Sequence, residues 1–343
     1  INALQNFSIN IPKGSIYGLL GPNGAGKSTF INILSGIVKK TQGSVIIEDI
    51  DQDTNPIATR KKIGIVGLGL IGGSLGLDLQ KLGYTVYGIT HREKTALKAR
   101  ERKLAQIVST DPSVLKNCSL IYIALPLEQL LNPSTALINA IPRNSVVTDV
   151  GSVKVPILNT WNKLHPRFVA SHPMTGTEES GVNAGQHNLF KNKPWVVTPN
   201  KETDQQALEI VHQISLSLGA KWISAEAPIH DEAVGLISHL PVLISAALLN
   251  TLSTDVKPSL YSLAKSIASS GFADTSRVGG GNPELGVSMA KFNKENIERH
   301  LASYRHSLDL FEKYLLEENW SELERILVNT QEERENFIVK PTN

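Results

Sequence analysis

A glycine-rich turn between an apolar strand and a helix constrains the fold of this chain more than any other feature of its sequence. Residues 63–66 form a short apolar run, GLGLIG follows at 67–72, and residues 73–82 have the apolar spacing of a helix. G-x-G-x-x-G is a weak signal alone, but between a strand and a helix it is typical of a dinucleotide-binding turn. Its first glycine permits the tight turn, the second lets the backbone approach a pyrophosphate, and the third lets the helix pack closely on the strand. The cofactor-binding candidates in this turn are Gly67, Leu68, Gly69, Leu70, Ile71 and Gly72.

The rest of the chain predicts an alternating region followed by a helical one. After residue 62, short apolar strands alternate with helical stretches, which indicates a Rossmann-type α/β fold with a doubly wound parallel sheet. Beyond about residue 226 the strands cease, so we predict a Rossmann domain over 62–225 and an all-helical domain over 226–343. The expected strands are 63–66, 85–89, 120–124, 145–148, 168–171 and 195–198, and the expected later helices are 230–252 (interrupted at Pro241), 259–269, 295–313 and 320–337.

The end of the second expected strand favours NADP over NAD. An NAD site usually places Asp or Glu there, because a carboxylate accepts hydrogen bonds from the ribose hydroxyls. Here the residues are Thr90, His91 and Arg92, whose hydroxyl, imidazole and guanidinium suit a 2′-phosphate. The alternative is that Arg92 begins a solvated helix and is balanced by Glu93, so NAD stays open as a cofactor. Further cofactor candidates are Leu125, Pro126 and Ser152.

A second glycine-rich loop, near the start of the chain, predicts a phosphate-binding loop. GPNGAGKS at 21–28 lies between an expected strand over 15–20 and an expected helix over 29–34, and another strand is expected over 44–48. In G-x-x-x-x-G-K-S, backbone N–H groups and a helix N-terminus cradle phosphates, the lysine reaches the outer phosphates, and the serine reaches a Mg²⁺. The candidate residues are Gly21, Gly26, Lys27 and Ser28.

Residues 1–61 resemble the beginning of an ABC-transporter nucleotide-binding domain, and the resemblance then stops. No LSGGQ-type signature and no acidic Walker B strand follow, and about sixty residues cannot complete the ABC core. We therefore predict an incomplete P-loop fragment that does not hydrolyse ATP. Whether it folds, retains a phosphate or results from a fused reading frame stays open, as does the true N-terminus, since the chain starts at Ile1.

Three further words carry residue types suited to chemistry. DVGSVK at 149–154 and SHPMTGTE at 171–178 each follow an expected strand, so we expect both on loops at the carboxyl ends of the sheet, where nicotinamide and substrate meet in this fold. The third word, GFADTSRVG at 271–279, belongs to the helical domain. We expect a cleft between the two domains to bring the three words together.

These words, in this order, resemble the prephenate/arogenate dehydrogenase family over residues 62–343. The segments that carry the resemblance are GLGLIGGSL, DVGSVK, SHPMTGTE, HDEAVGLISHLPV and DTSRVGGGNPEL, and they are most similar to the cyanobacterial arogenate enzymes. The resemblance implies an oxidoreductase of tyrosine biosynthesis. Such an enzyme oxidises a cyclohexadienol with loss of its ring carboxylate, giving tyrosine from arogenate or 4-hydroxyphenylpyruvate from prephenate. It also implies a homodimer formed through the helical domain.

Roles for individual residues follow from the resemblance and the chemistry of their side chains. A base must take the hydroxyl proton as the hydride leaves, and His172 is the candidate because a neutral imidazole suits this task. Ser152 is expected to hydrogen-bond the same hydroxyl or to orient the nicotinamide and the imidazole, and Arg277 to hold a substrate carboxylate bidentately. Further substrate-binding candidates are His230, His239, Ser238, Thr175 and Glu178, with helix packing as the alternative for the two histidines and a solvated loop carboxylate as the alternative for Glu178.

Two departures from the family favour arogenate over prephenate. Many relatives have a basic residue where this chain has Ala273, and some prephenate-preferring members have a second histidine where this chain has Val242. Less positive charge weakens the case for a substrate with a ketoacid side chain and suits one that bears an amine. Prephenate dehydrogenase activity with NAD or NADP stays the alternative.

Composition excludes several other classes of function. A single cysteine, Cys118, excludes a disulfide scaffold and a thiolate-rich metal site and fits a reducing compartment, so we expect a cytoplasmic protein without a metal. The 34 basic and 32 acidic residues give a net charge of +2, which argues against a nucleic-acid partner. No leader and no apolar run of about 18 residues is seen, so no membrane association is expected.

Two rival functions lack a required feature in the sequence. A hydroxyacid-dehydrogenase relative needs a lysine four residues after the glycine of G-x-x-x-K-x-x-x-N, and GQHNLFKNK from Gly185 does not provide it. An ATP-binding ABC-type module needs the signature and the Walker B strand that are absent.

Overall fold

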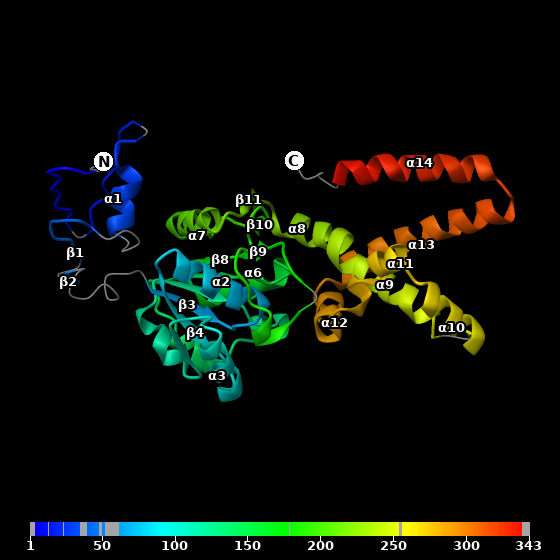
Figure 1. Ribbon diagram of the computed structural model, residues 1–343, viewed down its shortest axis with the longest axis horizontal. Helices are drawn as coiled ribbons and strands as arrows, with labels where there is room; N and C mark the ends of the chain where they lie inside the picture. The colour runs from blue at the N-terminus through cyan, green and yellow to red at the C-terminus, as the bar shows by residue number, and fades with distance from the viewer. Residues whose placement is uncertain are drawn as a thin grey trace. The chain divides into compact units, whose positions relative to one another are not determined.

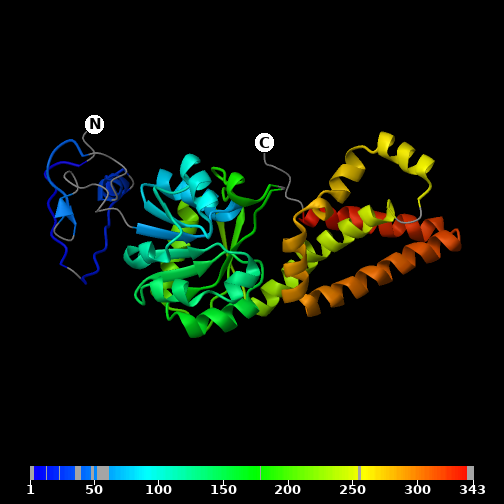
Figure 2. The same ribbon diagram turned by 90° about the horizontal axis from the view of Figure 1, so that it is seen from below.

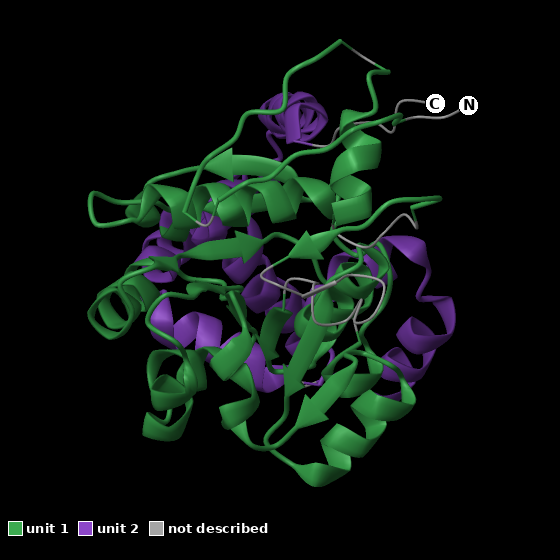
Figure 3. Ribbon diagram, turned by 90° about the vertical axis from the view of Figure 1, so that its left-hand side faces the viewer, with its two compact units in different colours: residues 1–231 green, residues 232–343 purple. Residues whose placement is uncertain are grey.

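The chain forms two compact units, residues 1–231 and residues 232–343, coloured green and purple in Figure 3. This computed structural model describes residues 4–12, 14–22, 24–34, 40–47, 50–51, 62–177, 179–253 and 256–337. Glu178, a predicted substrate contact, lies outside the described residues.

A six-stranded parallel sheet forms the core of the first unit and confirms the predicted Rossmann-type fold (Figure 1). Its strand order is β5-β4-β3-β6-β7-β8, so the chain runs outward in both directions from the central pair of β3 and β6. Every residue of β6 and β7 is buried, as expected for parallel strands that helices cover on both faces. The strands are β3 Lys62–Val66, β4 Thr85–Ile89, β5 Ile107–Ser109, β6 Leu120–Ile123, β7 Val146–Asp149 and β8 Phe168–Val169.

Helices connect these strands and cover the sheet. Among them, α2 packs on β3 and β4, and α7 packs on β7 and β8. The helices are α2 Leu70–Lys81, α3 Glu93–Glu101, α4 Leu127–Leu131, α5 Thr135–Ala140, α6 Val155–Leu164 and α7 Gln205–Ser217, with short 3₁₀ turns at Pro112–Asn117 and Gly181–Asn183.

A second, three-stranded sheet corrects the prediction of one strand over 168–171. That segment splits between β8 and β9 (Ser171–Pro173), and β9 pairs antiparallel with β10 (Pro194–Val197), which pairs parallel with β11 (Lys221–Ser224). The physical reason lies in Asp149, which takes over the hydrogen bonds of the chain at Ser171. The Ser171 backbone N–H donates to Asp149 Oδ1 (3.0 Å), and Ser171 Oγ donates to the Asp149 carbonyl (2.7 Å).

The second unit is helical throughout its described residues, as predicted. The long helix expected over 230–252 forms without a break at Pro241, but it widens into a π-helical turn at Gly235–His239 just before the proline. Proline has no N–H to donate, so a wider turn immediately before it accommodates the missing hydrogen bond. Helices α13 and α14 then form a helical hairpin (Figures 1 and 2). The helices are α8 Ala227–Val234, which crosses the boundary between the units, α9 Leu240–Thr251, α10 Pro258–Ile267, α11 Ser270–Ser276, α12 Pro283–Phe292, α13 Lys294–Leu316 and α14 Trp320–Phe337, with a 3₁₀ turn at Val278–Gly280.

Within its described residues, the N-terminal segment forms less regular structure than its sequence pattern predicts. The expected helix forms as α1 (Lys27–Leu34), and the described part of the strand expected over 44–48 contains β1 (Ile46–Ile47), which pairs with β2 (Ile50–Asp51). The strand expected over 15–20 does not form, and Ile16 and Leu20 are each 94% exposed. A single apolar strand needs neighbouring strands to bury it, and the described residues of this segment provide none for 15–20.

Candidate active site

In the glycine turn after β3, packing requires glycine at two positions, and the glycine between them borders open space. Gly67 has φ +94°, and a Cβ there would lie 2.2 Å from the Ala124 carbonyl oxygen, while a Cβ on Gly72 would lie 1.9 Å from the Gly67 carbonyl oxygen. A Cβ on Gly69 would meet no heavy atom within 4 Å. Packing therefore explains Gly67 and Gly72, whereas Gly69 borders open space where a ligand can approach the backbone, as a bound dinucleotide requires.

The other cofactor candidates lie at the carboxyl ends of neighbouring strands. The Ala124 backbone N–H donates to the Val66 carbonyl (2.7 Å), which places Leu125 and Pro126 beside the glycine turn. At the end of β4, Thr90 is buried, while His91 and Arg92 are exposed.

Glu93 does not balance Arg92, as one interpretation of the sequence assumed. It pairs with Arg100 instead (Oε1 to Nη1, 2.6 Å). Arg92 directly precedes α3, and its side chain makes no capping hydrogen bond to that helix. The guanidinium is thus accessible to an anionic group at the end of β4.

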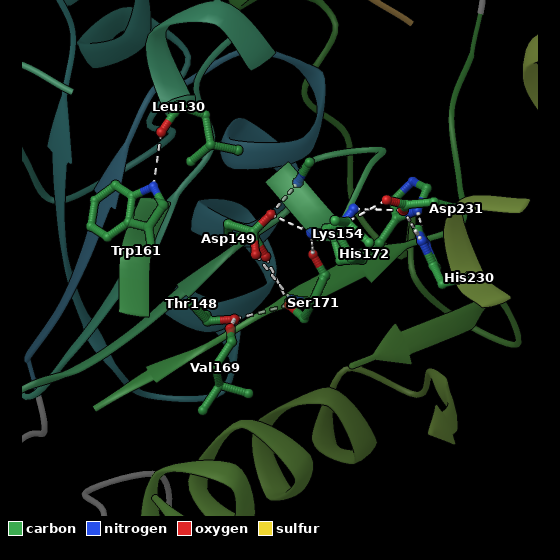
Figure 4. A network of polar contacts seen from close by, with 12 residues as sticks. Leu130, Thr148, Asp149, Lys154, Trp161, Val169, Ser171, His172, His230 and Asp231 are labelled. Carbon is green, nitrogen blue, oxygen red and sulfur yellow. Dashed lines mark hydrogen bonds and ion pairs between the residues drawn. The ribbon is translucent and has the colours of Figure 1, made fainter. Parts of the chain in front are cut away.

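A buried ion pair holds the DVGSVK turn after β7 (Figure 4). The side chains of Asp149 and Lys154 are both fully buried, and Lys154 Nζ donates to the Asp149 carboxylate and to the Ser171 carbonyl (2.6 Å). Asp149 Oδ2 also accepts from the Gly151 backbone N–H (2.8 Å). The half-buried Ser152 lies within the turn that these contacts close.

Burial and the charge of the partner shift the pKa values of Asp149 and Lys154 in opposite directions. Burial raises the pKa of the Asp149 carboxyl, and the Lys154 charge offsets part of that rise. Burial likewise lowers the pKa of the Lys154 amine, and Asp149 offsets part of that fall. Neither residue is among those predicted from the sequence to act in the site, although a lysine five positions after an aspartate at the end of an apolar strand is an available signal.

His172 lies in a chain of three side chains within the first unit (Figure 4). His172 Nδ1 is 3.0 Å from His230 Nε2, and His230 Nδ1 is 2.8 Å from Asp231 Oδ1. Asp231 in turn accepts from two backbone N–H groups at the start of α6, those of Lys154 (2.6 Å, Oδ1) and Val155 (2.9 Å, Oδ2). The same turn of the chain thus contains Ser152 and holds Asp231, the carboxylate that bonds to the partner of His172.

The structure places His172 on a strand instead of a loop and adds Asp231 to the site. SHPMTGTE was expected on a loop, but His172 lies on strand β9, paired with Val196 of β10. Pairing with a second strand fixes the backbone of His172 more firmly than a loop does. Asp231 was not among the predicted site residues, although it directly follows His230 in the word HDEAVG.

The remaining substrate candidates are distributed over both units. In the first unit, half-buried Thr175 donates from Oγ1 to the Leu189 carbonyl (3.1 Å). In the second unit, Arg277 follows α11 and is exposed, Ser238 is half-buried, and buried His239 contacts Asn293 (Nδ1 to Nδ2, 3.1 Å). The cleft that brings the three words together stays a prediction.

In the N-terminal phosphate loop, the lysine turns back on its own loop. Lys27 Nζ donates to the carbonyls of Gly21 (2.5 Å) and Pro22 (2.6 Å), while Ser28 is exposed. The ammonium group therefore satisfies loop carbonyls at the position from which it would otherwise reach a phosphate.

A doubly wound sheet with a glycine turn that leaves its middle position open is typical of a dinucleotide-binding domain, and comparison with known proteins supplies the family. Residues 75–224 match the family described as "Prephenate dehydrogenase, nucleotide-binding domain", and residues 226–329 match "Prephenate dehydrogenase, dimerization domain". Residues 4–70 match the ABC transporter family.

Individual relatives agree with these matches. The chain is 30% identical to a prephenate dehydrogenase of Bacillus subtilis, over 80% of this chain and 76% of that protein. The crystal structure of Synechocystis arogenate dehydrogenase is 38% identical with a TM-score of 0.68, and covers 81% of this chain and 100% of its own. A prephenate dehydrogenase from A. aeolicus, in complex with hydroxyphenyl propionate and NAD+, is 27% identical with a TM-score of 0.75, and covers 81% of this chain and 98% of its own. The chain therefore belongs to the prephenate dehydrogenase family, and it carries an ABC-transporter-like segment at its N-terminus.

Proposed function

We propose that the chain is a cytoplasmic arogenate dehydrogenase that uses NADP and forms tyrosine. The observation that carries this proposal is the His172 imidazole, which is held on strand β9 by a second histidine and lies close to the turn that contains Ser152. Family membership provides the class of reaction. The buried, single Cys118 fits the reducing compartment that the proposal assumes.

In the proposed reaction, His172 first takes a proton from the substrate and later returns it. A bound nicotinamide accepts the hydride from the ring carbon that bears the hydroxyl. His172 takes the hydroxyl proton as carbonyl character develops on that carbon, and Ser152 hydrogen-bonds the same oxygen. The ring carboxylate then leaves as CO₂, its bonding electrons complete the aromatic ring, and the proton returns to the phenol oxygen. Arg277 binds a substrate carboxylate, which lysine would hold less well.

The proposed substrate preference rests on two uncharged positions in the second unit. Ala273 lies in α11 and Val242 in α9, at the positions where the resemblance implies a basic residue in many relatives and a second histidine in some prephenate-preferring members. Without those cations, a side chain that bears an amine is favoured over a ketoacid. Prephenate is the second candidate substrate, because the named relatives include prephenate dehydrogenases.

One assay tests the proposed function. Reduction of NADP and of NAD should be measured with arogenate and with prephenate, beside ATP hydrolysis on the same preparation. We expect the highest kcat/KM with arogenate and NADP, and no ATP hydrolysis. A Lys27→Ala variant should have unchanged dehydrogenase activity, since Lys27 bonds only to its own loop in the described contacts. Reduction of neither cofactor with either substrate would refute the proposal.

The NADP assignment predicts a selective effect of Arg92→Glu. Replacing the exposed guanidinium by a carboxylate removes a charge-assisted hydrogen bond to the 2′-phosphate and adds repulsion, so KM for NADP should rise about 10- to 100-fold. KM for NAD should change far less, because NAD has no phosphate there. Lys116→Glu, at another exposed cation of the first unit, is the matched control and should change neither value. Equal effects of Arg92→Glu on both cofactors would contradict the assignment.

A homodimer is the proposed assembly. The second unit exposes many large apolar side chains, among them Leu260 (56%), Leu263 (57%) and Ile267 (68%) of α10, and the matched family is described as a dimerization domain. The continuous helix Ala227–Thr251 is also long and apolar enough to cross a membrane, with a mean hydropathy of 1.8 and 28% of its window buried. A second copy that covers such surface explains it without a membrane. Sedimentation of the full chain should give a dimer, and a fully active monomer at nanomolar concentration would contradict this.

A further inference from the structure

Asp231 and His230 form a chain that ends on the proposed base, and this geometry has a consequence for its protonation. We propose that His230 and Asp231 are positioning residues that fix the tautomer of His172, so that its ring proton lies on Nδ1 and its lone pair on Nε2. The inference rests on the proposed function only for the use of that lone pair. The tautomer itself is inferred from the contacts of Asp231 and a neutral His230.

Asp231 is held at the start of α6 as a hydrogen-bond acceptor. Its two oxygens accept from the backbone N–H groups of Lys154 (2.6 Å) and Val155 (2.9 Å) at the start of α6. A helix N-terminus favours a negative charge, so this site holds an ionised carboxylate well. An ionised carboxylate can only accept hydrogen bonds. The contact of 2.8 Å between Asp231 Oδ1 and His230 Nδ1 therefore places a proton on His230 Nδ1.

The protonation of His230 in turn determines which ring nitrogen of His172 carries the proton. A neutral imidazole carries one proton, so with Nδ1 protonated His230 has an acceptor at Nε2. His172 Nδ1 lies 3.0 Å from that atom and must supply the proton of the hydrogen bond. The two rings meet edge to face, with centroids 5.2 Å apart and planes at 73°. The lone pair of His172 is then on Nε2, the nitrogen that we assign to the substrate hydroxyl.

The same contacts change the role expected for His230. From the sequence, His230 is a candidate substrate-binding residue, with helix packing as the alternative. Both of its ring nitrogens are engaged within the first unit, and the residue is 3% exposed. A histidine with both nitrogens occupied has no donor or acceptor left for a substrate. Its effect on the reaction must therefore pass through His172.

Lys154, in the turn after β7, contacts both Asp231 and the chain next to His172. Lys154 donates its backbone N–H to Asp231 and its Nζ to the Ser171 carbonyl (2.6 Å), directly before His172. One residue thus holds both the anchor of the hydrogen-bonded chain and the strand that carries the base. When His172 takes a proton on Nε2, its Nδ1–H remains bonded to His230, and Asp231 stabilises the positive charge through that ring.

Nitrogen-15 NMR of the full-length protein, labelled in its histidine side chains, tests the tautomer without substrate. The His172 signals are identified by their loss in His172→Asn. In the wild type we expect His172 protonated at Nδ1 and unprotonated at Nε2. In His230→Leu, which has no acceptor, we expect Nε2-protonated His172 to increase. In His230→Gln, whose amide oxygen can occupy the place of His230 Nε2, the native tautomer should be retained.

Kinetics of the same variants separate positioning from substrate binding. His230→Leu should lower kcat by about 10² to 10⁴, the range between partial and complete loss of a correctly protonated base, with KM for substrate and cofactor unchanged. His230→Gln should recover most of this loss. His212→Gln, the same kind of change on α7, is the control and should leave kcat unchanged. A raised substrate KM with normal kcat in His230→Leu would restore the substrate-binding role and overturn the proposal.

The two proposals fail in different ways. An Nε2-protonated His172 in the wild-type spectrum overturns the positioning inference, whatever the substrate is. Absence of turnover with both arogenate and prephenate overturns the proposed function, while the NMR result still decides the tautomer. If His230→Leu does not fold, the wild-type spectrum and His230→Gln still decide the inference.

Discussion

Replacing His172 by asparagine should lower kcat by about 10² to 10⁴, the usual contribution of a positioned general base. Asparagine keeps a polar side chain of smaller size on strand β9, but its amide cannot take a proton at neutral pH. The hydroxyl proton must then leave to water while the hydride transfers, which raises the barrier of that step. Steady-state rates of NADP reduction at saturating arogenate measure the effect.

The controls for this prediction separate chemistry from binding. The dissociation constant for NADP should change little, because the glycine turn and Arg92 lie on other strand ends. His165→Asn is a poorer comparison, since buried His165 bonds to the Pro142 carbonyl (3.0 Å). His212→Asn on α7 is the better one and should retain full kcat. Turnover by His172→Asn equal to that of the wild type would remove His172 from the mechanism.

The elements that sequence analysis predicted well are those whose signal is local. The strand, glycine turn and helix around Gly67 form as expected, because residue types within about twenty positions determine them. The helix predicted over 320–337 has these bounds in the structure for the same reason. The opposite case is the strand predicted over 15–20, since its apolar pattern is correct but a strand also requires neighbours.

The parts of the site that escaped prediction depend on contacts between distant positions. Asp231 is adjacent to His230, yet its role arises from N–H groups 77 and 76 residues away, at Lys154 and Val155. The division of 168–171 between two sheets likewise depends on the carboxylate of Asp149, 22 residues before Ser171. Periodicity describes which face of an element is apolar, and it contains no information about such pairings.

The second large effect is expected at the buried ion pair. Lys154→Met should destabilise the first unit by about 3–5 kcal/mol, because it leaves the Asp149 carboxylate fully buried without its cation. Urea unfolding followed by tryptophan fluorescence measures the change, since Trp161 and Trp195 are fully buried in this unit. The matched control is Lys98→Met, which breaks the exposed pair of Lys98 with Glu101 and should cost less than about 1 kcal/mol. Equal losses in the two variants would contradict the importance assigned to the buried pair.

The loss in Lys154→Met should also depend on pH, in a direction fixed by Asp149. Burial already raises the pKa of this carboxyl above its ordinary value of 3.8, and removing the Lys154 charge raises it further. A group whose pKa is higher in the folded state binds its proton more tightly there, so the variant is least penalised below pH 3.8 and loses stability as the pH rises through the folded-state pKa. Asp149→Asn combined with Lys154→Met removes the ionisable group and should abolish this dependence. Because the same pair supports the turn of Ser152 and the strand of His172, activity in the single variant should fall over the same pH range as stability.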